Sequence, residues 1–374
     1  MDINVETLVV GGSAAGLAVA RSIEALGREA QVIEAEASPG IRWQTAYDRL
    51  RLHTPRSRSG LPYMPMPASY PRYPARQQVA DYLADYARAL QRPPIYGERA
   101  VSVSRAEEGW LVRSANRIFR SRNVVIATGG ARLPVIPRLP GIEEFGKQVL
   151  HTSLYSNGAP YAGCRVLVVG FGNSAAEIAI DLHEHGAHPV LSARGAVNVL
   201  PRDVLGVPVV TLGLIQRLFS PRVADAVSAP LMRLILGDLE KLGLQRLPYG
   251  PATQIAEHHQ IPVLDIGTID LIRRGKIEVR PGVAHFTPAG AVFADGRSEI
   301  FDAVLLGTGY RAGLEELLAD VPGVLDAEGT PLVSGGTTAA EGLYFCGFTV
   351  ASGGQLREIG IEARRIAERV RARS

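Results

Sequence analysis

Two glycine-rich turns are the residues of this chain whose types and spacing point most clearly to chemistry. They read Gly11-Gly12-Ser13-Ala14-Ala15-Gly16 and Gly170-Phe171-Gly172-Asn173-Ser174-Ala175. Each follows a run of β-branched residues and precedes a helix-forming segment, which is the arrangement that holds the pyrophosphate of a dinucleotide at a helix N-terminus. Because one such turn binds one dinucleotide, the sequence predicts two dinucleotides on one protein and electron transfer between them.

The first turn has glycines where a dinucleotide-binding unit needs them. Gly11 permits a tight turn after the predicted strand 5–10, and Gly16 permits the helix to pack closely on that strand. Ser13 replaces the middle glycine; its Cβ slightly hinders a pyrophosphate, although its hydroxyl can donate to one. The next predicted strand ends at Glu34, where a carboxylate would accept hydrogen bonds from ribose hydroxyls. The alternative is that Glu34 is a solvated loop acid.

The second turn differs at the position that selects the dinucleotide. Where an acid would favour NAD the chain has Ala193, and Arg194 follows it. A planar guanidinium can donate two parallel hydrogen bonds to a ribose 2′-phosphate, so this half is predicted to prefer NADP. The alternative is that Arg194 is an ordinary surface arginine.

Composition limits the other classes of function. The 374 residues suffice for two or three domains, and a net charge of +3 is too small to indicate a nucleic-acid partner. Neither a signal peptide nor a spanning helix is expected, because an acidic N-terminus leads directly into a strand and uninterrupted apolar runs are short. Cys164 and Cys346 are too far apart to form a C-x-x-C pair. The chain is expected to be cytoplasmic, and no metal site is predicted.

A segment before the second turn resembles the signature F-x-G-x-x-x-H-x-x-x-[YF] of flavin-containing monooxygenases. Phe145, His151 and Tyr155 match it, while the glycine is displaced by one residue and leaves Lys147 at its place. Further similar segments follow in the family's order; they are Gly40, Trp43, 50–56, Ala127-Thr128-Gly129, 262–268, Gly307-Thr308-Gly309-Tyr310 and 342–348. The chain therefore resembles this class of flavoprotein monooxygenases (class B), and within it the YUCCA-like and related bacterial branch.

The resemblance implies an α/β fold of two nested, doubly wound, Rossmann-like domains. Residues 1–158 and 285–374 would form the FAD-binding domain, and residues 159–284 the NADP-binding domain inserted within it. Residues 203–247 form a predicted helical insertion in the second domain. Three roles are open for it: a cap over the substrate, an interface with another subunit or a membrane surface, or core packing of a helical pair.

The turns and the resemblance together predict the site residues. A helix over about 355–370 could direct its positive N-terminal dipole at the flavin, and His53 is the candidate catalytic residue near the flavin's reactive edge, with a purely structural histidine as the alternative. The predicted cofactor-binding residues are Gly11, Ser13, Ala14, Ala15, Gly16, Glu34, Ala35, Gly40, Trp43, Ala127, Thr128, Gly129, Gly170, Gly172, Asn173, Ser174, Ala175, Arg194, Thr308, Gly309, Tyr310, Gly347, Gln355 and Leu356.

The implied activity is that of a flavin-dependent NADPH monooxygenase. NADPH would reduce FAD, the reduced flavin would react with O2, and a flavin C4a-hydroperoxide would deliver one oxygen atom to a small-molecule substrate. The substrate would be a soft nitrogen or sulfur nucleophile, or an aryl 2-oxo acid such as indole-3-pyruvate. An NADPH oxidase that releases peroxide and a non-catalytic flavin-binding regulator are the alternatives. A disulfide reductase is disfavoured because it needs a cysteine pair. A homodimer is conceivable, whereas nothing specific in the sequence supports peripheral membrane contact.

Overall fold

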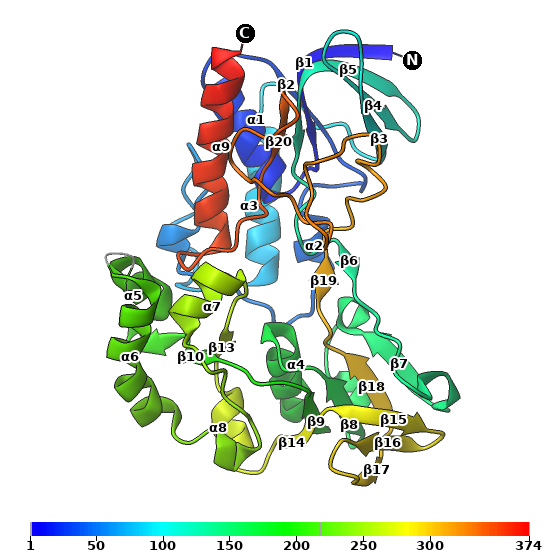
Figure 1. Ribbon diagram of the computed structural model, residues 1–374, viewed down its shortest axis with the longest axis vertical. Coiled ribbons are helices and arrows are strands. Elements are labelled where there is room, and N and C mark those ends of the chain that lie inside the picture. The colour runs from blue at the N-terminus through cyan, green and yellow to red at the C-terminus, as the bar shows by residue number, and fades with distance from the viewer. Residues whose placement is uncertain (1, 217–218, 374) are drawn as a thin grey trace.

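The first sheet of the structure is built around its N-terminal strand. In the computed structural model, which describes residues 2–216 and 219–373, β1 (Asp2–Val10) pairs in parallel with β2 (Ala30–Ile33) and β5 (Ile118–Ile126). The strand order is β2-β1-β5-β4-β3, and β20 (Leu343–Phe345) also pairs in parallel with β5. β4 (Trp110–Ser114) and β3 (Ala100–Arg105) complete an antiparallel meander. The upper unit in Figure 1 contains this sheet.

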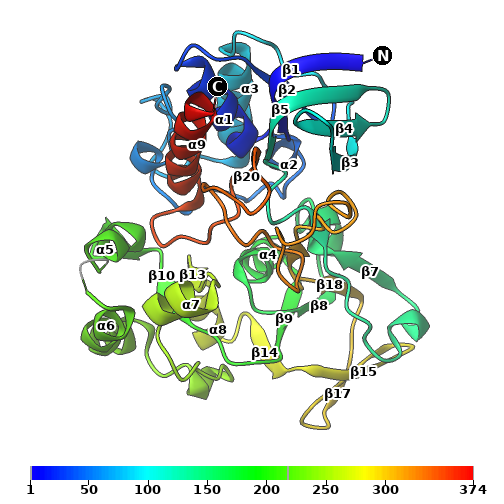
Figure 2. The same cartoon turned by 45° about the horizontal axis from the view of Figure 1, so that its top comes forward.

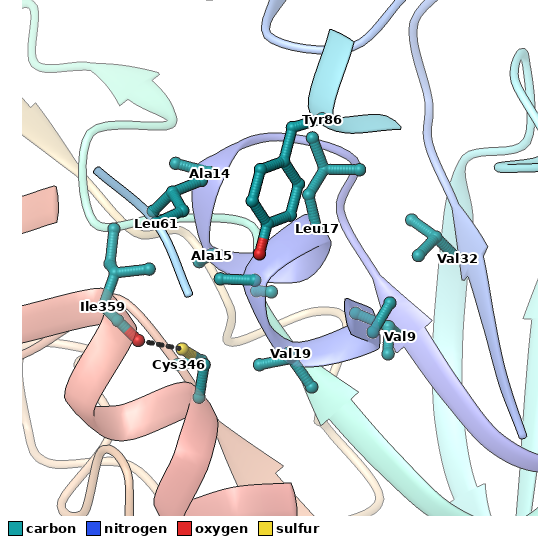
Figure 3. Close-up of a cluster of buried hydrophobic side chains, with 14 of the residues drawn as sticks. Val9, Ala14, Ala15, Leu17, Val19, Val32, Leu61, Tyr86, Cys346 and Ile359 are labelled. Carbon is teal, nitrogen blue, oxygen red and sulfur yellow. Dashed lines mark hydrogen bonds between the residues drawn. The ribbon is translucent and has the colours of Figure 1, made fainter. Parts of the chain in front are cut away.

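Alternate residues of the central strands enter two different cores. Val9 and Val125 face a helical layer made of α1 (Ala14–Glu24), α3 (Arg76–Arg88) and α9 (Gln355–Ala372). Leu8 and Val124 face the meander and the loop around Leu314. Because both faces are covered there, the last three residues of β1 and of β5 are all apolar and buried rather than alternately polar. Figure 3 shows the helical core, where α1 packs against α9 and the Cys346 thiol lies 3.9 Å from the Ile359 carbonyl oxygen.

The second sheet is entirely parallel, with the strand order β14-β9-β8-β18-β7. Helix α4 (Asn173–Glu184) covers one face, and an antiparallel three-stranded sheet covers the other, with Phe286, Phe293 and Phe301 buried between the two sheets. The strands are β7 (Gln148–His151), β8 (Arg165–Val169), β9 (His188–Ala193), β14 (Glu278–Pro281), β15 (Val283–Thr287), β16 (Gly290–Phe293), β17 (Ser298–Ile300) and β18 (Ala303–Leu306).

The membership of this sheet corrects the predicted domain boundaries. Residues 148–151 and 303–306 were assigned by the sequence to the first domain, yet β18 pairs with both β8 and β7 inside the second sheet. The chain enters the second unit before β7 and leaves it after β18. At the crossing, β6 (Leu133–Pro134) pairs with β19 (Tyr310–Arg311), so the two connections run antiparallel beside each other. The two nested α/β units themselves are confirmed.

The predicted insertion, 203–247, contains two helices, α5 (Val209–Gln216) and α6 (Pro221–Leu236), while residues 217–218 lie outside the described part. A short hairpin of β11 (Asp203–Val204) and β12 (Val207–Pro208) precedes them. Figures 1 and 2 both show α5 below the N-terminal end of α9. The remaining elements are α2 (Ile41–Gln44), β10 (Val199–Pro201), α7 (Pro251–His258), β13 (Val263–Asp265), α8 (Thr268–Arg273) and short 3-10 turns at 56–58, 142–144, 152–154, 159–161 and 240–242.

Helix α6 leaves several apolar side chains exposed, among them Val223, Val227 and Leu234. An exposed apolar face of this kind is typical of contact surfaces. Contact with another subunit or with a membrane surface therefore stays a prediction. Among the described residues, no helix is both long and apolar enough to cross a membrane.

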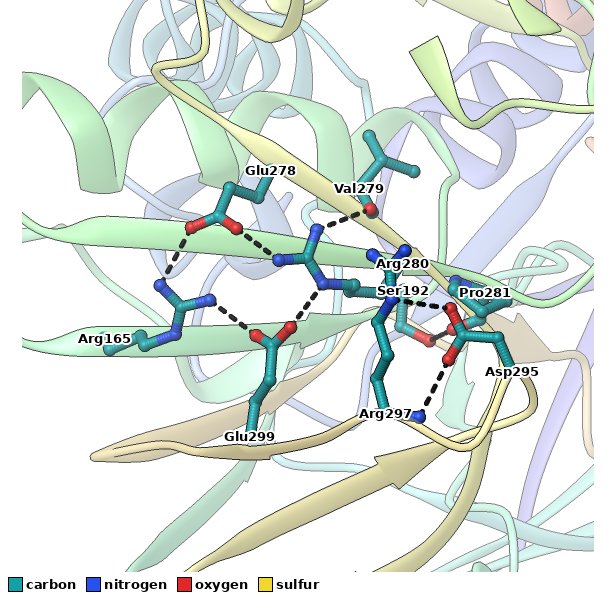
Figure 4. A network of polar contacts seen from close by, with 9 residues as sticks. All are labelled: Arg165, Ser192, Glu278, Val279, Arg280, Pro281, Asp295, Arg297 and Glu299. Atoms are coloured by element: carbon teal, nitrogen blue, oxygen red, sulfur yellow. Dashed lines mark hydrogen bonds and ion pairs between the residues drawn. The ribbon is translucent and has the colours of Figure 1, made fainter. Parts of the chain in front are cut away.

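An ion-pair network of two arginines and two glutamates joins three strands of the second unit (Figure 4). Arg165 donates to Glu278 at 2.8 Å and to Glu299 at 2.5 Å. Arg280 donates to the same two carboxylates, and its Nε lies 2.5 Å from Glu299. The four side chains thereby join β8, β14 and β17, which come from three separate stretches of the chain.

Candidate cofactor and active site

The first glycine turn lies at the carboxyl ends of β1, β2 and β5. The Gly11 amide donates to the Ile33 carbonyl oxygen at 2.8 Å, and Gly11 has a φ of +115°. A Cβ at Gly11 would lie 2.6 Å from the Ala127 oxygen, and one at Gly16 would lie 1.8 Å from the Gly11 oxygen. Both positions therefore require glycine, as the sequence predicted, and the turn opens at the edge where α/β sheets bind ligands.

Glu34 faces this turn from the end of β2. Its Oε2 accepts a hydrogen bond from the Gly12 amide at 2.5 Å, and its Oε1 accepts one from the Glu36 amide at 3.0 Å. Ser13 is the N-cap of α1, and its hydroxyl makes no capping hydrogen bond. A carboxylate beside the turn and an uncommitted hydroxyl at the helix start suit the ribose and pyrophosphate of a dinucleotide.

Two more predicted segments converge on the same turn. Thr128 follows β5, and its buried hydroxyl has no hydrogen-bond partner among the described residues. Gly347 follows β20; its amide donates to Glu362 at 2.6 Å, and its carbonyl accepts from the Gln355 side chain at 3.0 Å. A Cβ on Gly347 would lie 3.0 Å from that of Ala15, which places the start of α9 beside the start of α1. Ala127 lies against Gly11, and Leu356 packs in the same core as Ala14 and Ala15, whereas cofactor contact by Gly129 stays a prediction.

These observations fit an FAD at the first turn. The backbone is tightly closed around Gly11 and Gly16, while an added Cβ at Gly129 or Gly130 would meet open space. A buried hydroxyl at Thr128 without a partner is a group that a ligand would satisfy. Gly40 begins α2 with a φ of +62°, and Trp43 packs on the helical core; flavin contact by these two residues, and by Ala35, stays a prediction.

The second turn repeats the geometry of the first. Gly170 has a φ of +119°, and a Cβ there would lie 2.4 Å from the Gly307 oxygen. Gly172, by contrast, is open on its Cβ side. The Asn173 side chain accepts from the Leu264 amide at 2.7 Å and donates to the Pro262 carbonyl oxygen at 3.3 Å. Asn173 thus fixes β13 beside the turn, which is a structural role the sequence did not show.

Arg194 follows β9 at the carboxyl edge of the second sheet. Its side chain is exposed, and it has no hydrogen bond or ion pair within residues 2–216 and 219–373. A Cβ on Gly282 would lie 3.2 Å from the Arg194 Cγ, so a glycine there leaves room for the arginine. A guanidinium without a protein partner at this place fits a ribose 2′-phosphate. The residues of the second turn therefore fit NADP.

The signature segment fixes the crossing between the two units. The Phe145 ring packs edge-on against Phe286, and the His151 ring packs edge-on against Tyr310. The His151 Nε2 donates to the Gly309 carbonyl oxygen at 3.1 Å, and burial lowers the pKa of His151 below its usual value. Tyr155 donates to the buried carboxylate of Asp181 at 2.6 Å. The matched residues of the signature are thus explained by packing and hydrogen bonding.

Residues 307–310, on the connection that leaves the second unit after β18, make similar contacts. The Thr308 hydroxyl donates to the Val135 carbonyl oxygen at 2.5 Å, and Gly307 lies against Ala175 of the second turn. Arg42 lies over the Tyr310 ring, with 5.7 Å between the guanidinium carbon and the ring centre. Cofactor contact by Thr308, Gly309 and Tyr310 stays a prediction.

His53 lies where the two units meet. Its Nε2 is 2.6 Å from Oε1 of Glu177, a residue of α4 in the second unit. Nothing in the local sequence pointed to Glu177, or to Tyr47, whose ring is buried in the core of the second unit close to Glu177. The only local signal was a charged residue among the buried positions of an apolar helix, and this does not reveal a partner more than a hundred residues away.

A pocket of about 310 Å³ opens beside the segment that follows His53. Its wall combines residues of the first unit with the start of the insertion. It is lined by Pro55, Arg56, Ser57, Arg58, Arg72, Pro208 and Thr211. The Tyr73 hydroxyl donates to Asp203 at 2.5 Å, and Arg72 donates to the Gly206 carbonyl oxygen at 2.7 Å, so the insertion is joined to the first unit at this pocket.

Comparison with known proteins agrees with this geometry. The model of the pyridine nucleotide-disulphide oxidoreductase family matches residues 8–202. Indole-3-pyruvate monooxygenase YUCCA1 of Oryza sativa subsp. japonica is 36% identical over 349 residues, covering 91% of this chain and 86% of its own. Indole-3-pyruvate monooxygenase YUCCA6 of Arabidopsis thaliana is 35% identical, covering 96% and 89%.

Solved structures give the same result at the level of the fold. A flavin-containing monooxygenase from Stenotrophomonas maltophilia superposes with a TM-score of 0.76 at 28% identity, over 99% of each chain. Cyclohexanone monooxygenase from Rhodococcus sp. Phi1 bound to NADP+ superposes with a TM-score of 0.75 at 16% identity, over 100% of this chain and 85% of that one. The chain belongs to the YUCCA-like family of flavin monooxygenases, which are oxidoreductases that use FAD and NADP.

Proposed function

We propose that this monooxygenase acts on an aryl 2-oxo acid, with indole-3-pyruvate as the first candidate. The observation that carries the proposal is the 36% identity to a relative of that name over nine tenths of the chain. In the proposed reaction one atom of O2 bonds to the keto carbon, the bond from that carbon to the carboxylate breaks, and CO2 leaves. The other oxygen atom leaves as water, and NADPH supplies the two electrons.

Each unit has one task in this proposal. The first turn, with Glu34 and the start of α9, holds FAD, and the second turn, with Arg194, holds NADPH. FAD reduced by NADPH supplies the oxygen chemistry, and the C4a-hydroperoxide that the family resemblance implies is part of the proposal. The protein orients the two dinucleotides and excludes water between the units, where His53 lies against Glu177.

The pocket beside His53 supports an acidic substrate. The Arg58 guanidinium lines it without a side-chain hydrogen bond or ion pair to any residue that the structure describes. Arg72 lies 3.5 Å from Asp203, which neutralises only part of the positive charge of the pocket. A guanidinium binds a carboxylate bidentately, whereas an amine or a sulfide gains nothing from it. The insertion then acts as the cap over the substrate, which is the first of the three roles that the sequence left open.

Substrate and cofactor can be tested together on the purified protein. We expect a yellow protein that releases FAD rather than FMN on denaturation. NADPH oxidation should be faster with indole-3-pyruvate than with an aryl amine or a sulfide of similar size. A colourless protein that FAD does not reconstitute would contradict the cofactor assignment. Stimulation by the amine or the sulfide alone would contradict the oxo acid but not the monooxygenase.

The oxidase alternative is separated by stoichiometry. An oxidase releases one peroxide for every NADPH consumed, whereas a coupled monooxygenase releases little in the presence of substrate. The exposed Arg194 argues against a non-catalytic regulator, because a flavin sensor has no need of NADP. A homodimer and a cytoplasmic location stay predictions from the sequence.

A further inference from the structure

A buried carboxylate joins the two units at His53. The Glu177 side chain is 3% exposed, and its Oε1 lies 2.6 Å from the His53 Nε2. His53 belongs to the first unit and Glu177 to α4 of the second, so the contact spans the interface between them. A carboxylate buried at such a place costs free energy unless it receives good hydrogen bonds.

Tyr47 lies beside this carboxylate. It comes from the first unit, and its ring is buried in the core of the second unit. Its hydroxyl lies close to the side chains of Glu177 and Ser174. Burial, and after it the negative charge of Glu177, raises the pKa of the Tyr47 hydroxyl far above its usual value. The hydroxyl therefore stays protonated, so that it can donate a hydrogen bond to Glu177 and accept one from Ser174.

A chain of neighbouring polar side chains runs from the second glycine turn to His53. Ser174 belongs to that turn, one position after Asn173 at the start of α4. From there the chain passes through Tyr47 and Glu177 to the His53 ring. Each link joins residues that are distant in sequence, so the chain forms only when the two units are docked.

The geometry also determines which ring nitrogen of His53 carries the proton. A carboxylate accepts hydrogen bonds, so the Nε2 that faces Glu177 must be protonated. In the neutral ring, Nδ1 then has a free lone pair. This Nδ1 is buried and has no hydrogen-bond partner among the residues that the structure describes. It is the atom of the ring that is left to meet a bound group.

We propose that Glu177 is a positioning residue that holds His53 in the Nε2–H tautomer and, through Tyr47 and Ser174, links the orientation of that ring to the occupancy of the second glycine turn. The catalytic consequence rests on the proposed function, because it assumes that His53 lines the reacting face of the flavin. The tautomer and its link to the turn do not depend on any activity.

The tautomer is measured by nitrogen NMR on the holoenzyme with labelled histidine. The signal of His53 is assigned by its absence in His53→Ala. We expect the Nε2–H pattern in the wild type and a mixture of tautomers in Glu177→Gln, because an amide can donate as well as accept. Asp181→Asn is the matched control, since Asp181 is the neighbouring buried acid of α4 and bonds to Tyr155 instead. An Nδ1–H pattern in the wild type would overturn the proposal without any variant.

The link to the second turn is tested with NADP+ as the probe. Adding NADP+ should shift the His53 signal in the wild type, and Tyr47→Phe should abolish that shift while it retains the Nε2–H tautomer. Tyr47→Phe keeps the ring that packs in the core, so it is expected to fold even if Glu177→Gln does not. An equal shift in Tyr47→Phe would remove Tyr47 from the link.

The catalytic consequence is tested by a double-mutant cycle on coupling. The readout is the fraction of consumed NADPH that appears as peroxide in the presence of indole-3-pyruvate. His53→Ala and Glu177→Gln should each raise this fraction, and the double variant should resemble His53→Ala alone, because Glu177 acts through the histidine. Additive effects would mean that Glu177 acts by another route. A wild type that releases all its NADPH equivalents as peroxide would contradict the proposed function and leave the tautomer result intact.

Discussion

At the scale of single residues, we propose that Arg194 determines the preference for NADPH over NADH. Arg194 is exposed at the carboxyl edge of the second sheet and pairs with nothing in the described ranges, so its positive charge is available to a 2′-phosphate. We expect Arg194→Ala to raise the KM for NADPH by roughly 10- to 100-fold, in line with the loss of about 1.5–3 kcal/mol in charge-assisted hydrogen bonds. The KM for NADH should hardly change. Steady-state kinetics with both coenzymes checks this, and equal losses would show that the arginine is structural.

At the scale of residues, positions within one short strand-turn-helix unit could be predicted from the sequence, whereas contacts between distant segments could not. Glu34 and Arg194 were predicted as cofactor contacts by counting from a glycine turn, because the strand-turn-helix geometry fixes those distances within one short unit. Glu177 and Asp181 were not identified, since their partners His53 and Tyr155 come from other segments of the chain. A buried acid on an apolar helix indicates that some partner exists, but helical periodicity alone does not say which one.

At the scale of elements, the second glycine turn combines one tightly closed position with one open position. Gly170→Ala should lower the melting temperature strongly, because its Cβ would meet the Gly307 oxygen at 2.4 Å and its φ is +119°. Gly172→Ala is the matched control, since nothing surrounds its Cβ. It should leave the melting temperature nearly unchanged and raise the KM for NADPH roughly tenfold, or about 1.4 kcal/mol. Thermal unfolding and kinetics on both variants test the pair, and a Gly172→Ala enzyme with normal KM would place the pyrophosphate elsewhere.

The ion-pair network of the second unit gives a pH-dependent prediction. Burial raises the pKa of Glu299, but the hydrogen bonds and charges of Arg280 and Arg165 outweigh it, so the net pKa lies below its usual value. A carboxyl with a lowered pKa in the folded state stabilises the fold at neutral pH, and this contribution is lost as the pH falls through the lowered pKa. Glu299→Gln should cost about 1 kcal/mol at pH 7 and progressively less in acid.

Denaturant unfolding from neutral pH down to about pH 3 measures this loss. The exposed Glu107, substituted in the same way, serves as the control and should show almost no difference from the wild type. A cost for Glu299→Gln that is constant across this range would mean that packing, rather than the ion pairs, carries the effect.

Elements were predicted more reliably than their assembly. The C-terminal helix, predicted over about 355–370, extends from Gln355 to Ala372, and the strand predicted to lead to Glu34 ends at Ile33, directly before it. Strands β7 and β18 were placed in the wrong unit, because a short apolar strand carries no mark of the sheet that it joins. Their pairing with β8 depends on long-range contacts that a local pattern does not encode.

At the scale of the whole molecule, two dinucleotide units face each other across a pair of antiparallel connections. The signature residues pack and hydrogen-bond at these connections, and His53 contacts Glu177 across the interface. This arrangement allows a reduced flavin, a nicotinamide and a substrate to meet at one place. The pocket between the insertion and residues 55–58 lies at the same junction, and we propose it as the substrate site.

The destination of molecular oxygen tests the central claim most directly. The protein is supplied with NADPH and indole-3-pyruvate under ¹⁸O₂, and the acid produced is analysed by mass spectrometry together with the peroxide released. The account predicts one labelled oxygen atom in the acid that is one carbon shorter, one CO2 for each NADPH consumed, and little peroxide. Consumption of NADPH with all of the label in peroxide and none in an organic product would contradict it.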